Sequence, residues 1–266
     1  MLIYYGVCAG LLGLIFGSFL NCTAMRIVRG EDFVKGRSHC MSCGHELFAP
    51  DLVPLFSYLV HKGRCRYCKA KISVRYPITE FVFMLLSLGL YVAFIGFGLG
   101  SYITFFKYWF LTGCLYLIAL TDLESFDIPD GALLLGGVSW VIFTALEVMM
   151  GVHDLKWAFH HLLAGLIIGG AMLLISLIMD KILGRDSLGG GDIKLYALLG
   201  LYLGYAGSYE LIILSCLLGL LFAGARKILL PTASKEFPFG PAIALGGYIL
   251  LIFGDALTGW YLGLLT

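Results

Sequence analysis

Two aspartates stand at the ends of apolar segments in unusual surroundings. Asp192 follows three glycines in LGGGDIKLYALLG (188–200), and Asp122 opens DLESFDIPD (122–130) at the end of another apolar segment. Two carboxylates that share a proton can hydrolyse a peptide bond, because one activates a water while the other protonates the carbonyl or the leaving amine. These residue types indicate an aspartyl peptidase, provided that the fold brings the two acids together.

For either acid alone, the simpler interpretation is a solvated side chain or a helix cap. For Asp192, the three preceding glycines argue against this simpler interpretation. Glycine destabilises an ordered segment, so three glycines in a row need another reason. Three in a row indicate unusual backbone torsions or the close approach of another chain, such as an extended substrate. We therefore expect Gly189, Gly190 and Gly191 to contact substrate.

Four cysteines form a second group of candidate functional residues. CMSC and CRYC place Cys40, Cys43, Cys65 and Cys68 in two C-x-x-C knuckles separated by 21 residues. This spacing is typical of a tetrahedral zinc site, and four thiolates leave no open position, so the predicted role of the metal is structural. Disulfides or a redox pair are the alternatives, and a reducing cytoplasm would disfavour disulfides. His39 and His45 are expected to lie at the surface.

The composition indicates the setting. The 266 residues are 60% hydrophobic and 13% charged, with a mean hydropathy of +0.93. Soluble domains are about 45–50% apolar and about 25% charged, so this is an integral membrane protein. A helical span needs about 20 apolar residues. We predict an all-α polytopic fold of about eight transmembrane helices, with seven as an alternative, near 2–25, 78–98, 101–121, 131–150, 158–183, 193–207, 209–224 and 241–262.

Basic residues predict the orientation, because Lys and Arg gather on the cytoplasmic side. Sixteen of the 18 fall on one side of the predicted spans, ten of them in residues 26–77, and only Lys107 and Lys156 fall on the other. The N-terminus is therefore expected outside, with residues 26–77, the cysteine loop, in the cytoplasm. Two predicted spans separate Asp122 from Asp192, so both acids lie at the same face.

The predicted organisation is a first transmembrane helix (1–25), the cysteine loop as a small zinc-binding unit (26–77) and a seven-helix peptidase core (78–266). The net charge of +1, without a basic and aromatic array, gives no sign of nucleic-acid binding. The partner expected from composition is the lipid bilayer.

With these residues in place, the sequence resembles the type IV prepilin peptidases, bifunctional leader peptidases and N-methyltransferases. The resemblance covers nearly the whole chain and rests on stretches in the family's order: GSFLNCTAMR, GRSHCMSC, GRCRYCKAKISVRYPITE, DLESFDIPD, GGGDIKLYALLG and FPFGPAIALGGY. It assigns cleavage to Asp122 and to Asp192 of the G-x-G-D signature. Asp127 replaces a residue that is usually apolar, which leaves it as an alternative to Asp122.

The resemblance also implies what the protein does. Its substrates would be type IV prepilins or pseudopilins, whose basic leader is cut after a glycine at the cytoplasmic face of a bacterial inner or plasma membrane. S-adenosylmethionine would then donate a methyl group to the new N-terminus, at a site the sequence does not reveal. Glu80, Phe239 and Gly240 are further candidate substrate contacts. A helix start explains Phe239 and Gly240 equally well, and an acid such as Glu80 is also ordinary in the first turn of a helix.

Two other classes of protein remain possible from these residues. An intramembrane protease of the presenilin type also uses a G-x-G-D acid, but it lacks a four-cysteine loop. A transporter or zinc-dependent scaffold would explain spans, knuckles and intramembrane acids without hydrolysis. Transporter acids lie deep along a pathway, whereas Asp122 and Asp192 are predicted at one face.

Overall fold

The computed structural model describes residues 2–32, 36–94, 99–185, 187–229 and 237–265. In these ranges the secondary structure is helical, and the only β-structure is a pair of isolated bridges in the cysteine loop. Seven of the helices are long and apolar enough to cross a membrane. The prediction of an all-α polytopic membrane protein is therefore confirmed.

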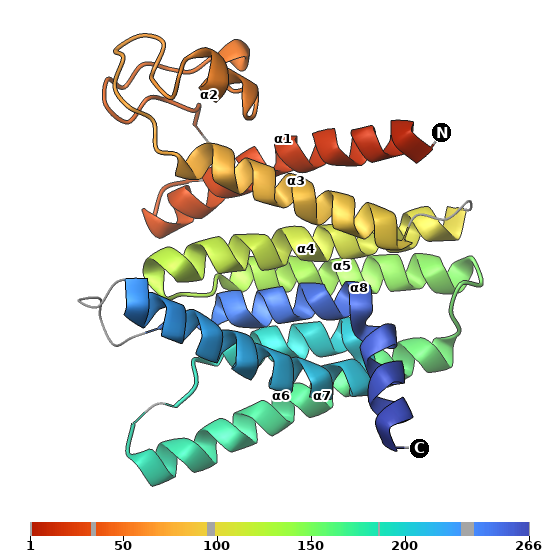
Figure 1. The fold of residues 1–266 in the computed structure, drawn as a ribbon. Coiled ribbons are helices and arrows are strands. Elements are labelled where there is room, and N and C mark those ends of the chain that lie inside the picture. Colours follow the sequence, from red (N-terminus) through yellow and green to blue (C-terminus); the bar gives the residue numbers. More distant parts are fainter. Residues whose placement is uncertain (1, 33–35, 95–98, 186, 230–236, 266) are drawn as a thin grey trace. The chain divides into compact units, whose positions relative to one another are not determined.

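The chain divides into two compact units, Met1–Ile95 and Gly96–Thr266. In the first unit, helices α1 (Leu2–Val28) and α3 (Arg75–Phe94) pack against each other (Figure 1). The cysteine loop joins them and contains a 3-10 turn, η1 (Ala49–Asp51), and a short helix, α2 (Phe56–Val60). Helix α3, part of the predicted 78–266 core, thus packs with α1.

Small residues allow α1 and α3 to approach closely. A Cβ on Gly13 would lie 2.8 Å from the Cα of Met84, and one on Gly17 would lie 3.0 Å from the Cα of Glu80. At the opposite end of the pair, the Tyr91 hydroxyl donates to the Leu2 carbonyl at 2.6 Å. The two helices therefore run antiparallel and meet along the small-residue face that membrane helices commonly use.

The second unit contains five helices around a shared core. Helix α4 packs against α5 and α8, and α7 packs against α5, α6 and α8 (Figure 1). The buried side chains of Ile118, Leu195 and Ile243 come from three of these helices. The bounds are α4 (Leu99–Ser125), α5 (Asp130–Met149), α6 (Leu155–Leu183), α7 (Gly190–Leu229) and α8 (Gly240–Leu265).

Helix α7 folds back on itself at Gly204. This glycine has φ 67° and ψ −165°, outside the helical region. The Tyr196 and Ser215 hydroxyls lie 2.5 Å apart, whereas 19 residues of straight helix would separate them by about 28 Å. His161 packs against Gly204, where a Cβ would lie 3.1 Å from its Nε2. The two arms correspond to the predicted sixth and seventh spans, although the reversal at Gly204 comes before the predicted boundary between those spans, at 207–209.

A buried ion pair joins α4 to α5. The Lys107 ammonium lies 2.6 Å from a Glu147 carboxylate oxygen, and both side chains are 1% exposed. Thr104 donates to the other oxygen at 3.0 Å, and the Trp157 ring lies 4.7 Å from the ammonium. Lys107 therefore lies in the interior of the helix bundle. Without it, the excess of exposed basic residues on one side of the predicted spans is larger than the sequence count indicated.

Candidate active site and candidate metal centre

Asp122 lies in the last turn of α4 and is 5% exposed. Its Oδ2 accepts a hydrogen bond of 2.8 Å from the backbone N–H of Gly240, the first residue of α8. The first N–H groups of a helix have no partner within the helix and carry a partial positive charge. The start of α8 therefore holds the Asp122 carboxylate in one orientation.

The close approach at Gly240 leaves no room for a side chain. A Cβ there would lie 2.7 Å from Asp122 Oδ2 and 3.1 Å from its Cγ. The sequence suggested Gly240 as a substrate contact and missed this hydrogen bond. The available signal was FPFGP itself, since proline in the first turn after a glycine marks a helix start whose N–H groups need acceptors.

Asp192 lies in the first turn of α7 and is partly buried. Its carboxylate accepts a hydrogen bond from the backbone of Gly189 and feels the charge of Asp122. The turn after α4 contacts the start of α7 through Ile128 and Gly191, so the two acids lie within electrostatic range of each other. We refer to Asp122 and Asp192 as the acid pair.

The glycines before Asp192 have a structural use that the sequence analysis did not foresee. A Cβ on Gly191 would lie 2.8 Å from the Cβ of Ile128, so this glycine lets the turn between α4 and α5 approach α7. Gly190 has open space around it. None of the three has a left-handed φ, so close approach rather than unusual torsion explains Gly191. Contact of these glycines with substrate stays a prediction.

The neighbouring acids differ from the acid pair in exposure. Asp127 is exposed, and its charge acts on the Asp122 carboxyl. Asp130 is also exposed, and its carboxylate lies 2.6 Å from the Lys194 ammonium, which ties the start of α5 to the start of α7. Burial therefore favours Asp122 over Asp127 as the partner of Asp192.

The remaining predicted contacts occupy different environments. Phe239 packs on the second arm of α7, where a Cβ on Gly219 would lie 2.6 Å from its ring. Glu80 belongs to the first unit, where its buried carboxylate accepts a hydrogen bond of 2.7 Å from the backbone N–H of Leu55. Glu80 thus has a structural partner in the cysteine loop, and its contact with substrate stays a prediction.

The four cysteines converge on one point in the first unit. Their sulfur atoms lie within 4.8 Å of one another, and Cys40 Sγ is 3.8 Å from Cys68 Sγ. A regular tetrahedron with Zn–S bonds of about 2.3 Å has sulfur atoms about 3.8 Å apart. All four are free thiols, and His39 and His45 are exposed as predicted. The cluster therefore fits a tetrahedral metal ion.

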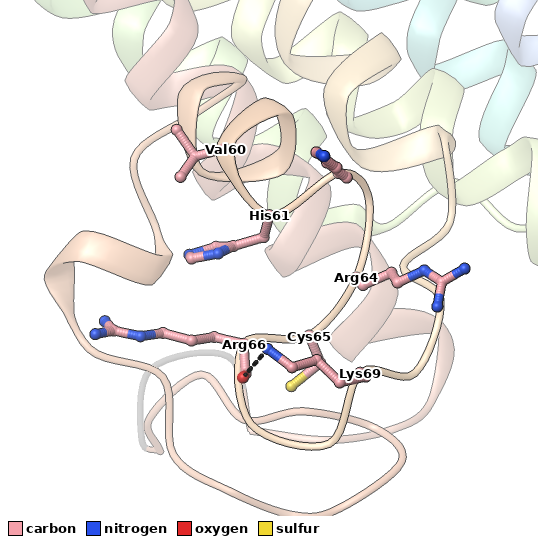
Figure 2. A pocket seen from close by; sticks show the side chains of 7 residues that line it. Val60, His61, Arg64, Cys65, Arg66 and Lys69 are labelled. Carbon is pink, nitrogen blue, oxygen red and sulfur yellow. Dashed lines mark hydrogen bonds between the residues drawn. The ribbon is translucent and has the colours of Figure 1, made fainter.

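The two knuckles have the same backbone form. The Gly44 N–H donates to the Cys40 carbonyl at 2.8 Å, and the Lys69 N–H donates to the Cys65 carbonyl at 3.0 Å. Gly44 and Lys69, each four residues after its cysteine, have φ of 70° and 60°. Figure 2 shows the second knuckle, in which Cys65 is surrounded by basic side chains.

Backbone hydrogen bonds also favour the thiolate form of Cys40. Hydrogen bonds from the Ser42 and Cys43 backbones lower the pKa of the Cys40 thiol to about 6. The Ala70 backbone acts in the same direction on Cys68, but burial and hydrogen bonds among the thiols raise its pKa to about 11. Binding of a metal ion would require all four thiols to ionise.

The fold and these two sites define a class: a polytopic helical membrane protein with an acid pair and a separate four-cysteine cluster. Residues 11–94 match the model of the bacterial peptidase A24 N-terminal domain, and residues 109–224 match that of the type IV leader peptidase family. The chain belongs to the type IV leader peptidase family.

Curated relatives agree over most of the chain. The prepilin leader peptidase/N-methyltransferase of Aeromonas hydrophila is 35% identical, over 85% of this chain and 74% of the relative. The enzyme of the same name from Bacillus subtilis is 30% identical, over 95% and 96%. The type 4 prepilin-like proteins leader peptide-processing enzyme of Escherichia coli is 30% identical, over 92% of both chains. No solved structure matches the chain.

Proposed function

We propose that this membrane protease cuts the leader from type IV prepilin-like proteins with Asp122 and Asp192, and then N-methylates the new N-terminus. Membership of the leader peptidase family and the names of the relatives support both activities. What supports the assignment of the residues is the contact between the turn after α4 and the start of α7, with Asp122 buried and held by the Gly240 N–H.

In the proposed reaction the two carboxylates have different roles, one as the base and the other as the acid. They share a proton: one deprotonates the attacking water while the other protonates the carbonyl oxygen and later the leaving amine. The pair titrates as a unit, so neither proton state belongs to one residue alone. The Gly240 N–H fixes one oxygen of Asp122, which leaves its other oxygen for proton transfer.

Both acids lie at helix ends, Asp122 in the last turn of α4 and Asp192 in the first turn of α7. With α5 and α6 between them, they lie at one face of the membrane in either orientation. The distribution of Lys and Arg supports the cytoplasmic face, with the N-terminus outside. A prepilin whose apolar segment stays in the bilayer would then present its leader junction at the depth of the acid pair.

Zinc is the metal that we assign to the four cysteines. Four thiolates complete its coordination and leave no position for substrate, so its role is to stabilise the cysteine loop. The loop has little core of its own: of the four cysteines only Cys65 is buried. A metal commonly replaces a hydrophobic core in units of this size.

S-adenosylmethionine is the methyl donor in this proposal, and we assign it to a cavity in the first unit. The cavity has a volume of about 540 Å³ and is bounded by the end of α1, both knuckles and the start of α3. Met25, Leu47 and Ile72 offer apolar contacts for an adenine, and Arg29 and Glu31 offer charges for the carboxylate and ammonium of the methionine part. The bound donor supplies an activated methyl group, which these residues orient.

The test of this cavity is direct binding. Labelled S-adenosylmethionine is equilibrated with the purified protein, and Glu31→Gln should weaken its retention without changing cleavage. Exposed Glu124, at the end of α4, provides the control Glu124→Gln, which should bind as the wild type does. Equal retention by both variants would remove Glu31 from the donor site.

The test of the acid pair is a cleavage assay with a prepilin in detergent, read by mass. Asp122→Asn and Asp192→Asn keep the side-chain shape but remove the shared proton, so each should lower the rate by about 10²–10⁴-fold. The exposed Asp127→Asn is the matched control and should keep most of the activity. If either of the first two variants cleaves at the wild-type rate, that residue is not part of the acid pair.

A further inference from the structure

A second, smaller pocket lies beside the second knuckle. It has a volume of about 440 Å³, and its lining carries four permanent positive charges and no acid. Figure 2 shows these side chains around the pocket, between α2 and the knuckle. The lining residues are Val60, His61, Lys62, Arg64, Cys65, Arg66 and Lys69. Such a lining suits an anion.

The positive charge is only partly balanced within the protein. Arg66 lies 3.8 Å from Asp51, and the Lys69 ammonium donates to the Arg66 carbonyl at 3.0 Å. In the part of the chain that the structure describes, neither Lys62 nor Arg64 has an acidic partner. Residues 26–77 hold ten basic and four acidic residues. A zinc ion with four thiolates carries two negative charges, so an excess of positive charge remains.

Apolar side chains project beside this pocket. Three apolar residues of the short helix α2 are exposed: Phe56 is 65% exposed, Leu59 71% and Val60 56%. Val60 also lines the pocket, so the apolar and basic surfaces are continuous. A single ligand that covers both must carry an anionic group next to an apolar part.

The position of α2 indicates where that ligand comes from. Leu55, which precedes α2, donates its N–H to Glu80 at 2.7 Å, and it does so with a left-handed φ of 58°. Glu80 is the sixth residue of α3, a helix that can cross the membrane from Arg75 onward, so it lies about 8 Å along the helix from its start. The hydrogen bond therefore holds α2 at the depth where α3 enters the bilayer.

We propose that α2 and the basic pocket bind an anionic phospholipid of the surrounding bilayer. Lys62, Arg64 and Lys69 hold the phosphate, while Phe56 and Leu59 enter the region of the glycerol and upper acyl chains. Amphipathic helices bind membranes in this way, with apolar residues inserted and basic residues at anionic headgroups. A soluble phosphate would occupy the pocket but would leave the apolar side chains in water, which is why we assign a lipid.

The first experiment measures lipid retention by the purified, full-length protein. Native mass spectrometry follows phosphatidylglycerol and phosphatidylethanolamine through graded detergent exchange. Lys62→Gln with Lys69→Gln is the test variant, because these two residues line the smaller pocket and not the larger one. Each basic residue near an anionic surface strengthens binding about fivefold. The double variant should therefore retain phosphatidylglycerol about 25-fold more weakly, with phosphatidylethanolamine unchanged.

The control for this experiment is Arg37→Gln, which removes an exposed charge of the first knuckle that pairs with Glu46 at 3.1 Å. It should retain phosphatidylglycerol as the wild type does, and both variants should keep their metal content. Unchanged retention by the Lys62→Gln, Lys69→Gln variant would overturn the proposal. An equal loss of phosphatidylglycerol by Arg37→Gln would also overturn it, because retention would then depend on the overall positive charge and not on the pocket.

The second experiment measures depth and separates a lipid from a free anion. Phe56→Trp in vesicles that contain phosphatidylglycerol should be quenched by lipids brominated on the upper acyl chain. Met41→Trp, at an exposed position of the first knuckle, should not be quenched, after subtraction of the four native tryptophans. If Phe56→Trp is not quenched while millimolar inorganic phosphate displaces phosphatidylglycerol from the wild type, the pocket binds a free phosphate and the lipid assignment is wrong.

Discussion

Replacement of Gly240 by alanine tests whether the position of the Asp122 carboxylate controls cleavage. The added Cβ would lie 2.7 Å from Asp122 Oδ2, whereas ordinary contact begins at 3.4 Å, so the carboxylate must move by about 0.7 Å. The Gly240 backbone is not in the left-handed region, so alanine can adopt it and keeps the N–H. The change therefore displaces the acid without removing its hydrogen-bond donor.

The expected loss of activity follows from this displacement. A misplacement of about 1 Å at a reacting group lowers the rate by about 10²-fold, so a shift of about 0.7 Å should lower cleavage by roughly 10- to 100-fold. Overpacking at the same contact should also lower the free energy of unfolding by about 1–3 kcal/mol. The protein should still insert into the membrane and retain its metal.

The assay compares turnover of a prepilin per folded enzyme, with thermal unfolding in detergent measured in parallel. Gly137→Ala in α5 is the matched control, because no atom lies within 4 Å of the added Cβ, and it should cleave as the wild type does. If Gly240→Ala cleaves at the wild-type rate with normal stability, the orientation of Asp122 does not matter to the chemistry, and the proposed role of this residue is refuted.

Three further predictions concern the metal, the second activity and the buried ion pair. Cys68→Ser should lose the bound metal, measured by elemental analysis, and should loosen the cysteine loop; an intact wild type without metal would contradict this. The Asp122→Asn, Asp192→Asn double variant should still methylate a pilin supplied already cut, measured by mass, because amine attack on a sulfonium methyl needs positioning rather than a shared proton. Glu147→Gln should destabilise the protein by about 3–5 kcal/mol in thermal unfolding, and Lys107→Met with Glu147→Leu should recover most of this loss, because a buried ion pair is harmful mainly when half of it is removed.

The sequence determined the features that depend on local pattern and composition. Apolar runs of sufficient length gave the spans, since the bilayer sets a minimum helix length. The C-x-x-C spacing indicated a metal site because each knuckle is a local turn. The even number of spans between Asp122 and Asp192 predicted that both acids lie at one face. These conclusions require only the order of the segments and not their packing.

The tertiary structure alone decided which distant residues meet. The N–H of Gly240 reaches Asp122 across 118 residues of chain, and no periodicity encodes such a contact. Lys107 was counted on the outer side of the predicted spans, yet it is buried in the helix bundle, where Glu147 on a neighbouring helix pairs with it. The exact point at which α7 reverses was also not encoded locally. Gly204 is one of several glycines in that stretch, and it has the non-helical φ of 67° and lies against His161. Each of these contacts depends on how helices approach one another, which composition and spacing leave open.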